Sequence, residues 1–120
     1  MLLKNIILVG LGGMLGSILR YLADHFISHE RFPYSTLLVN VLGSFVIGAI
    51  MGIAGRQDDF GNWRLFLATG VCGGFTTFSA LAWQNLQLLN QQRYTTFIIY
   101  TGSSLVLGLL AVFLGYTITK

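Results

Sequence analysis

Charged residues are scarce in this sequence, and their scarcity excludes a water-soluble domain. Only 9% of the 120 residues are charged and 54% are hydrophobic, whereas a soluble domain carries about 25% charged residues. The net charge of +3 arises from seven Lys and Arg against four Asp and Glu, spread thinly over connections and ends. No basic stripe could track a phosphate backbone, so we expect no nucleic-acid partner. The length suits a single domain, residues 1–120.

Cysteine and histidine are also rare, which argues against disulfides and side-chain metal sites. Cys72 is the only cysteine, so no disulfide can form within the chain. The two histidines, His25 and His29, fall in a polar connection. One such pair is weak support for a metal site, and we interpret both as solvated loop histidines.

Carboxylates are missing from most of the apolar sequence. All four, Asp24, Glu30, Asp58 and Asp59, lie outside the second, third and fourth apolar segments. A proton-coupled antiporter or a cation pathway generally needs a carboxylate within the membrane, which argues against a small four-span drug or cation antiporter. No Ser–His–Asp set, paired carboxylates or phosphate-binding glycine loop can be assembled either, so we do not expect an enzyme.

Long apolar segments dominate the sequence. Four of them, at about residues 2–23, 32–55, 65–91 and 94–118, are long enough to cross a bilayer as helices, which takes about 20 residues each. Their short connections predict an all-α, multi-pass protein in membrane lipid, with four antiparallel transmembrane helices. The first segment lacks a small-residue cleavage site and is followed by charges and further spans, which indicates a retained span rather than a secretory signal.

The third segment carries a stretch, TGVCGGFTTFSAL at residues 69–81, that suits a continuous helix poorly. A glycine in a helix interior costs about 1 kcal/mol relative to alanine, and β-branched threonine lowers helix propensity further. The glycines and threonines concerned are Gly70, Gly73, Gly74, Thr76 and Thr77. Irregular backbone at membrane depth is tolerated only where protein buries it or where it lines a cavity. We therefore predict a functional break near the middle of the third helix.

Glycine also recurs at a four-residue spacing that brings helices close together. Such a pair places two small residues on one helix face, and in lipid this lets two backbones pack tightly. The pairs are Gly12 and Gly16, Gly48 and Gly52, and Gly70 and Gly74. We expect these positions to mark helix–helix contacts.

The distribution of Lys and Arg gives almost no instruction about orientation in the membrane. One side would hold Lys4, Arg56, Arg64 and Lys120, and the other Arg20, Arg31 and Arg93. Without a bias the chain can insert both ways, which opens the possibility of an antiparallel dimer. Arg20, near the end of the first segment, can snorkel to the interface or draw anions into a vestibule.

Polar side chains within the segments have two interpretations each. Thr36, Asn40 and Ser44 share one helix face. Asn40 either forms an interhelical hydrogen bond, worth about 1 kcal/mol, or points its amide N–H at a passing anion. Tyr100 and Ser104 also share a face, either as packing or as the start of a polar pathway.

Several strings together resemble the CrcB/Fluc family of fluoride channels. They are GGFTTFS in the third segment, VNVLGSFVIG at residues 39–48 and GGMLGSILRY at residues 12–21. The resemblance extends over every apolar segment and implies a fluoride-selective passive channel that exports fluoride from the cytoplasm across the bacterial inner membrane. It further implies an antiparallel, dual-topology dimer with two pores and a structural sodium ion at the dimer interface.

The resemblance also implies roles for individual residues. The sodium ion would be held by the backbone carbonyls of Gly73 and Thr76 in both subunits. Fluoride is strongly hydrated, so a narrow pore must replace its water with donors such as an amide N–H, hydroxyls and the electropositive edge of an aromatic ring. The implied fluoride pathway runs past Arg20, Asn40, Phe78, Ser79, Leu81, Tyr100 and Ser104.

Some positions depart from the family pattern along this pathway. Leu81 stands where the family usually has a second phenylalanine, and Gln84 where a glutamate is common. The polar row of the fourth segment ends in Gly108 and Val112. Either the channel accepts leucine, or this chain pairs with a different homologous subunit that supplies the ring. We expect a homodimer, because the weak charge bias suits one chain inserted both ways, and a heterodimer is the alternative.

Overall fold

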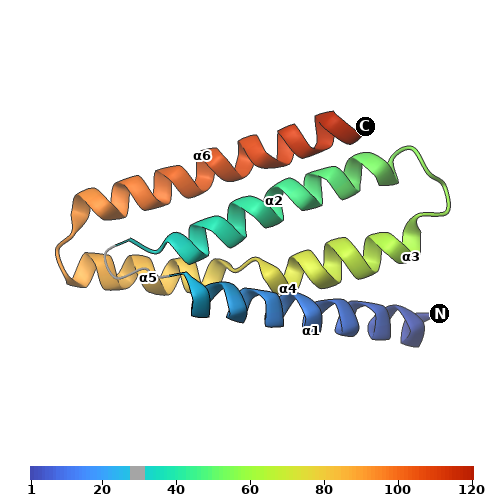
Figure 1. Cartoon of the computed structure of the whole chain (residues 1–120), viewed down its shortest axis with the longest axis horizontal. Helices are drawn as coiled ribbons and strands as arrows, with labels where there is room; N and C mark the ends of the chain where they lie inside the picture. Colours follow the sequence, from blue (N-terminus) through green and yellow to red (C-terminus); the bar gives the residue numbers. More distant parts are fainter. Residues whose placement is uncertain (28–31) are drawn as a thin grey trace.

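The structure of the chain, a computed structural model, describes residues 1–27 and 32–120. Within these residues helices are joined by turns and short loops, and no strand is present. The elements are α1 (Leu2–Phe26), α2 (Tyr34–Ala54), α3 (Gly61–Arg64), the π-helical η1 (Leu65–Cys72), α4 (Gly73–Phe75), α5 (Phe78–Asn90) and α6 (Tyr94–Thr119). They form an elongated bundle of 50 × 29 × 23 Å (Figure 1).

Four helical passages of the described chain are long and apolar enough to cross a membrane. They are α1, α2, the segmented run Gly61–Asn90, called here the third passage, and α6. The prediction of an all-α protein with four spans is therefore confirmed. Large hydrophobic side chains, among them Ile98, Leu109 and Phe113 of α6, remain exposed. An apolar surface of this kind suits contact with lipid rather than with water.

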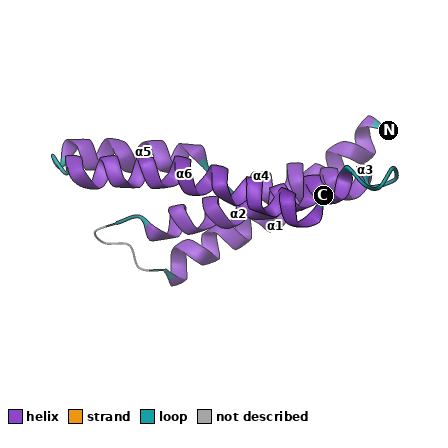
Figure 2. Cartoon of the chain, turned by 90° about the horizontal axis from the view of Figure 1, so that it is seen from above, coloured by secondary structure: helices purple, strands orange, loops and turns teal. Residues whose placement is uncertain are grey.

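The third passage lies between α2 and α1, and α6 lies on the far side of α2 (Figure 1). α2 packs along α6, while α1 packs along η1 and α4, the first half of the third passage. The second half, α5, packs against α6 instead, and Figure 2 shows these two helices together at one end of the molecule. The third passage therefore changes its packing partner near its middle.

Close backbone contacts at glycine hold the helices together. A Cβ atom built on Gly12 would lie 2.9 Å from the Gly70 Cα, and one on Gly16 would lie 2.8 Å from the Phe75 amide nitrogen. Gly48 of α2 lies equally close to the backbone of α6. A side chain at these positions would collide with backbone that cannot move aside. The glycine spacing thus marks helix contacts, as expected for association in lipid.

The end of α1 differs from the sequence-based expectation. The helix continues to Phe26, past the predicted end near residue 23, because no glycine or proline interrupts it there. His25 consequently lies in the last turn of α1, with its ring stacked on Tyr21, so its assignment to a loop is wrong. His29 and the rest of the predicted turn at residues 28–31 lie outside the described residues.

Candidate functional site

The helix break lies at Thr76 and Thr77, between α4 and α5. Both residues have extended backbone, with φ −84° and ψ 156° at Thr76 and φ −151° and ψ 123° at Thr77. α5 begins at the next residue and is capped by Thr77, whose Oγ1 accepts a 3.1 Å hydrogen bond from the Ala80 amide. The predicted break is present, and it falls at the threonine pair, while Gly73 and Gly74 stay helical.

Asn40 of α2 pairs with the backbone of Thr77 through both polar atoms of its amide. Nδ2 donates to the Thr77 carbonyl at 3.1 Å, and the Thr77 amide donates to Oδ1 at 2.8 Å. These bonds satisfy backbone groups that an extended residue cannot pair within a helix. The interhelical hydrogen bond considered for Asn40 is therefore formed. Because its NH2 group carries two hydrogens, one N–H is left for a second partner.

The break redirects two amide donors away from backbone carbonyls. In an uninterrupted α-helix the Thr77 amide would donate to the Gly73 carbonyl, and the Ala80 amide to the Thr76 carbonyl. Here the Thr77 amide donates to Asn40, and the Ala80 amide donates to the Thr77 hydroxyl oxygen. The Gly73 and Thr76 carbonyls thereby lose their helical donors. Carbonyls released in this way by discontinuous helices can coordinate a cation.

Neighbouring carbonyls at the end of the first half have other donors. The Cys72 carbonyl accepts from the Thr76 amide at 3.0 Å and from Thr76 Oγ1 at 2.8 Å. The Gly74 carbonyl accepts from Nε of Arg20, on α1, at 3.2 Å. The break is thus held by side chains from α1 and α2 as well as by its own threonines.

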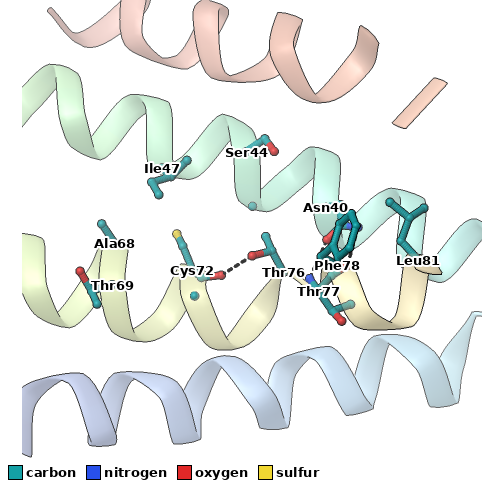
Figure 3. Close-up of a pocket in the computed structure, with 12 residues that line it drawn as sticks. Asn40, Ser44, Ile47, Ala68, Thr69, Cys72, Thr76, Thr77, Phe78 and Leu81 are labelled. Carbon is teal, nitrogen blue, oxygen red and sulfur yellow. Dashed lines mark hydrogen bonds between the residues drawn. The ribbon is translucent and has the colours of Figure 1, made fainter. Parts of the chain in front are cut away.

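A cavity of about 350 Å³ lies between α2 and the third passage, beside the break (Figure 3). Among the predicted site residues, Asn40, Gly73, Thr76, Phe78 and Leu81 line it. Phe78 is 79% exposed, so the rest of the chain leaves this residue largely uncovered. The structure therefore brings the predicted sodium ligands and part of the predicted fluoride pathway to one open cavity.

The remaining predicted pathway residues, Arg20, Ser79, Tyr100 and Ser104, do not line this cavity. Tyr100 is fully buried, and its hydroxyl donates to Gln84 Oε1 at 2.6 Å. Ser104 Oγ donates to the Tyr100 carbonyl of its own helix at 2.7 Å. The hydroxyl hydrogens of these two residues are therefore engaged within the chain. Ser79 is exposed in the first turn of α5.

Two residues gain roles that the sequence analysis left unassigned. Gln84 accepts from Tyr100 and donates from Nε2 to Thr36 Oγ1 at 2.9 Å, so it links α5 to both α6 and α2. The available signal was a polar amide within an apolar span, since such groups usually face a partner. Thr77 caps α5 and binds Asn40. A threonine directly before an apolar helical run is a known cap signal.

Comparison with known proteins assigns the chain to a family. The family described as "CrcB-like protein, Camphor Resistance (CrcB)" matches residues 7–116. The chain belongs to the CrcB family. The match includes α2, α4 and α5, and with them the broken passage and the cavity beside it.

Relatives of this CrcB-family chain are described as "Fluoride-specific ion channel FluC". The relative from Azobacteroides pseudotrichonymphae is 40% identical over 99% of this chain and 98% of its own length. A relative from Thermus thermophilus is 47% identical over 94% of this chain and 91% of its own. With four membrane-spanning helices among its described residues and ion channels as its relatives, the CrcB-family chain is a multi-pass integral membrane protein and not an enzyme.

Proposed function

We propose that this chain is a fluoride-selective passive channel that exports fluoride from the cytoplasm across the bacterial inner membrane. The observation that carries the proposal is the nearly full-length similarity to relatives described as fluoride-specific ion channels. The fluoride pathway would pass the cavity beside the helix break, where Asn40, Phe78 and Leu81 meet. A four-span drug or cation antiporter is disfavoured, because α2, the third passage and α6 contain no carboxylate.

The chemistry of the cavity suits a small, strongly hydrated anion. Asn40 has one amide N–H left after pairing with Thr77, and the edge of the Phe78 ring is electropositive. The exposed hydroxyl of Ser79 adds a donor at the start of α5. Donors of this kind replace the water around fluoride, whereas Leu81 contributes shape and excludes water.

The pathway would continue past Tyr100 and Ser104 of α6, with Arg20 supplying positive charge near its mouth. In the structure the Tyr100 hydroxyl donates to Gln84. Fluoride at this point would therefore take over the hydrogen bond of Tyr100, and Gln84 would have to release it. The interpretation of Tyr100 and Ser104 as a polar pathway thus requires this exchange.

The partner in the proposal is a second, antiparallel copy of the chain. The cavity is open, and Thr69, Gly73 and Phe78 are exposed beside it, which leaves the pathway incomplete within one chain. A symmetric dimer repeats each contact, so a copy that covers this face would complete two pores. The nearly even division of Lys and Arg between the two sides supports insertion in both orientations.

A structural sodium ion at the dimer interface fits the donors at the break. Gly73 and Thr76 offer carbonyls that have lost their helical donors, at the end of a half-helix whose dipole favours positive charge. Among the described residues no three His, Cys, Asp or Glu residues form a metal-binding group. Backbone oxygens are therefore the fitting ligands, and they suit a hard cation. Bound sodium would supply a positive charge that the carbonyls at the helix breaks of both subunits share.

Efflux from liposomes that contain only this chain tests the proposed function. We expect vesicles loaded with fluoride to release it down the gradient, while vesicles loaded with chloride retain chloride. Phe78→Ala should abolish release while crosslinking still detects the dimer, which would exclude a non-transporting assembly subunit. Absence of fluoride release from the wild-type chain would refute a homodimeric channel.

Leu81 is the specific reason to keep a heterodimeric channel as the second candidate. It lines the cavity at the position where a ring would complete the pathway, and leucine has no electropositive edge to offer an anion. If the chain alone releases no fluoride, co-reconstitution with a homologous subunit that carries phenylalanine at that position should restore release. Failure of both preparations would refute either form of the channel.

A further inference from the structure

Arg20 contacts the helix break from α1, on the side of the third passage opposite to α2 (Figure 1). The residue is half-buried, and its Nε donates to the Gly74 carbonyl at 3.2 Å. Gly74 lies in α4, the last helical segment before the break. In an uninterrupted helix the Gly74 carbonyl would accept from the Phe78 amide, but the extended threonine pair separates these two residues.

The end of a helix is where a donor from outside has the largest effect. The last carbonyls of a helix have no partner within it, and they carry the negative end of the helix dipole. A basic side chain there can donate to a carbonyl and balance the dipole. The Cys72 carbonyl obtains its donors from Thr76 within the same passage, whereas the Gly74 carbonyl obtains one from another helix.

The packing of α1 explains how Arg20 reaches this carbonyl. A Cβ atom on Gly74 would lie 3.0 Å from the Gly13 Cα, and one on Gly16 would lie 2.8 Å from the Phe75 amide nitrogen. Positions three and four residues apart share one face of a helix, so Arg20 continues the contact face of Gly13 and Gly16. The glycines bring the backbones together, and the next long side chain on that face meets the break.

We propose that Arg20 is a positioning residue that caps the first half of the broken helix and thereby sets the direction of the Gly73 and Thr76 carbonyls. The consequence for sodium rests on the proposed function, whereas the cap itself does not. This role requires a hydrogen-bond donor at the place of Nε. Snorkelling and anion attraction require only a positive charge at the end of a long side chain.

Substitutions at position 20 separate the donor from the charge. Arg20→Gln places an amide nitrogen the same number of bonds from Cα as the arginine Nε, without the charge. Arg20→Lys keeps the charge but has a methylene group at that place. Arg20→Met has neither donor nor charge. The glutamine variant should therefore retain the cap, and the lysine and methionine variants should lose it.

Hydrogen–deuterium exchange of the full chain in detergent reports on the cap without any need for conduction. We expect the amides of residues 72–80 to exchange about 10-fold faster in Arg20→Lys and Arg20→Met than in the wild type, as loss of one hydrogen bond implies. Arg20→Gln should remain close to the wild type. Amides of residues 105–115, in α6 on the far side of the bundle, serve as the internal control.

Fluoride efflux at graded sodium concentrations, with N-methylglucamine as the replacement cation, gives a second readout. The lysine and methionine variants should need more sodium to reach half of their own maximal efflux than the wild type and Arg20→Gln need, whatever the loss of charge in Arg20→Gln and Arg20→Met does to the maximal rate. In the opposite order the lysine variant would resemble the wild type and the glutamine variant would resemble the methionine variant. That result would refute the capping role and show that Arg20 acts through its positive charge. Unchanged exchange in every variant would refute the capping role as well.

These experiments distinguish a failure of the proposed function from a failure of the proposed cap. A wild-type chain without fluoride efflux would refute the proposed function, while the exchange rates of Arg20→Gln and Arg20→Lys still decide the cap. If Arg20→Met does not fold, the comparison between glutamine and lysine remains sufficient. Both side chains are polar, but only glutamine has a donor at the place of Nε and only lysine carries a charge.

Discussion

Replacing Asn40 by alanine should loosen the third passage at its break. The substitution removes both hydrogen bonds to Thr77, of 3.1 and 2.8 Å, and leaves a backbone N–H and a backbone C=O without these partners. A polar group left unsatisfied costs about 1–3 kcal/mol, and a hydrogen bond between membrane helices averages about 0.6 kcal/mol. For the pair we expect a loss of about 2 kcal/mol, which is about 30-fold in the unfolding equilibrium constant.

Titration with SDS in mixed micelles, followed by tryptophan fluorescence, measures this change in the free energy of unfolding. Trp63 and Trp83 lie in α3 and α5, on the two sides of the break. Ser44→Ala is the matched control, because Ser44 lies one turn further along the same face of α2 and lines the same cavity.

A loss below about 0.5 kcal/mol, the range of ordinary surface substitutions, would refute the reasoning, as would a loss equal to that of Ser44→Ala. Either result would mean that the backbone holds the break without Asn40. In that case the amide would be free for the pathway, and its substitution should affect fluoride efflux alone.

Other substitutions test the remaining contacts of the site. Leu81→Phe should preserve or raise fluoride efflux, because it returns a ring to the cavity; abolished efflux from an intact dimer would show that leucine is fitted to its place. Gly16→Val should destabilise the packing of α1 on the third passage by about 1–3 kcal/mol in the same SDS titration, whereas Gly10→Val, which meets open space, should change little. Equal losses for these two variants would contradict the glycine contact face. Thr77→Ala should cost about 1 kcal/mol by removing the cap of α5, and Thr77→Ser should recover most of it; a serine variant as unstable as the alanine variant would argue against the cap.

Local composition predicts the spans and the existence of the break. Each span across a bilayer needs about 20 apolar residues. Because only 9% of the residues are charged, most of the chain is apolar, and its long apolar segments suit few places other than the membrane. The glycines and threonines of the third segment weaken a helix wherever they stand, which is why a break is expected there. These properties depend on neighbours in sequence and need no knowledge of the fold.

Local composition does not predict which residues of the third passage form the break. Composition points to Gly73 and Gly74 as strongly as to the threonines, yet the glycines stay helical and the backbone becomes extended at Thr76 and Thr77. Part of the reason is long-range, since Asn40 offers a donor and an acceptor to Thr77. The glycines are occupied in another way, because Gly74 lies against the backbone of α1.

The sequence by itself therefore determines a four-span membrane protein with an interrupted third helix, together with the strings that indicate its family. The tertiary structure alone decides what the polar side chains do, because their partners are distant in the chain. Asn40 lies 37 residues from Thr77 and Arg20 lies 54 from Gly74. Both interpretations of Asn40 place it on the same helix face, and only packing shows that face turned to the break. The donors redirected there leave the Gly73 and Thr76 carbonyls without helical partners, a consequence that no local pattern contains.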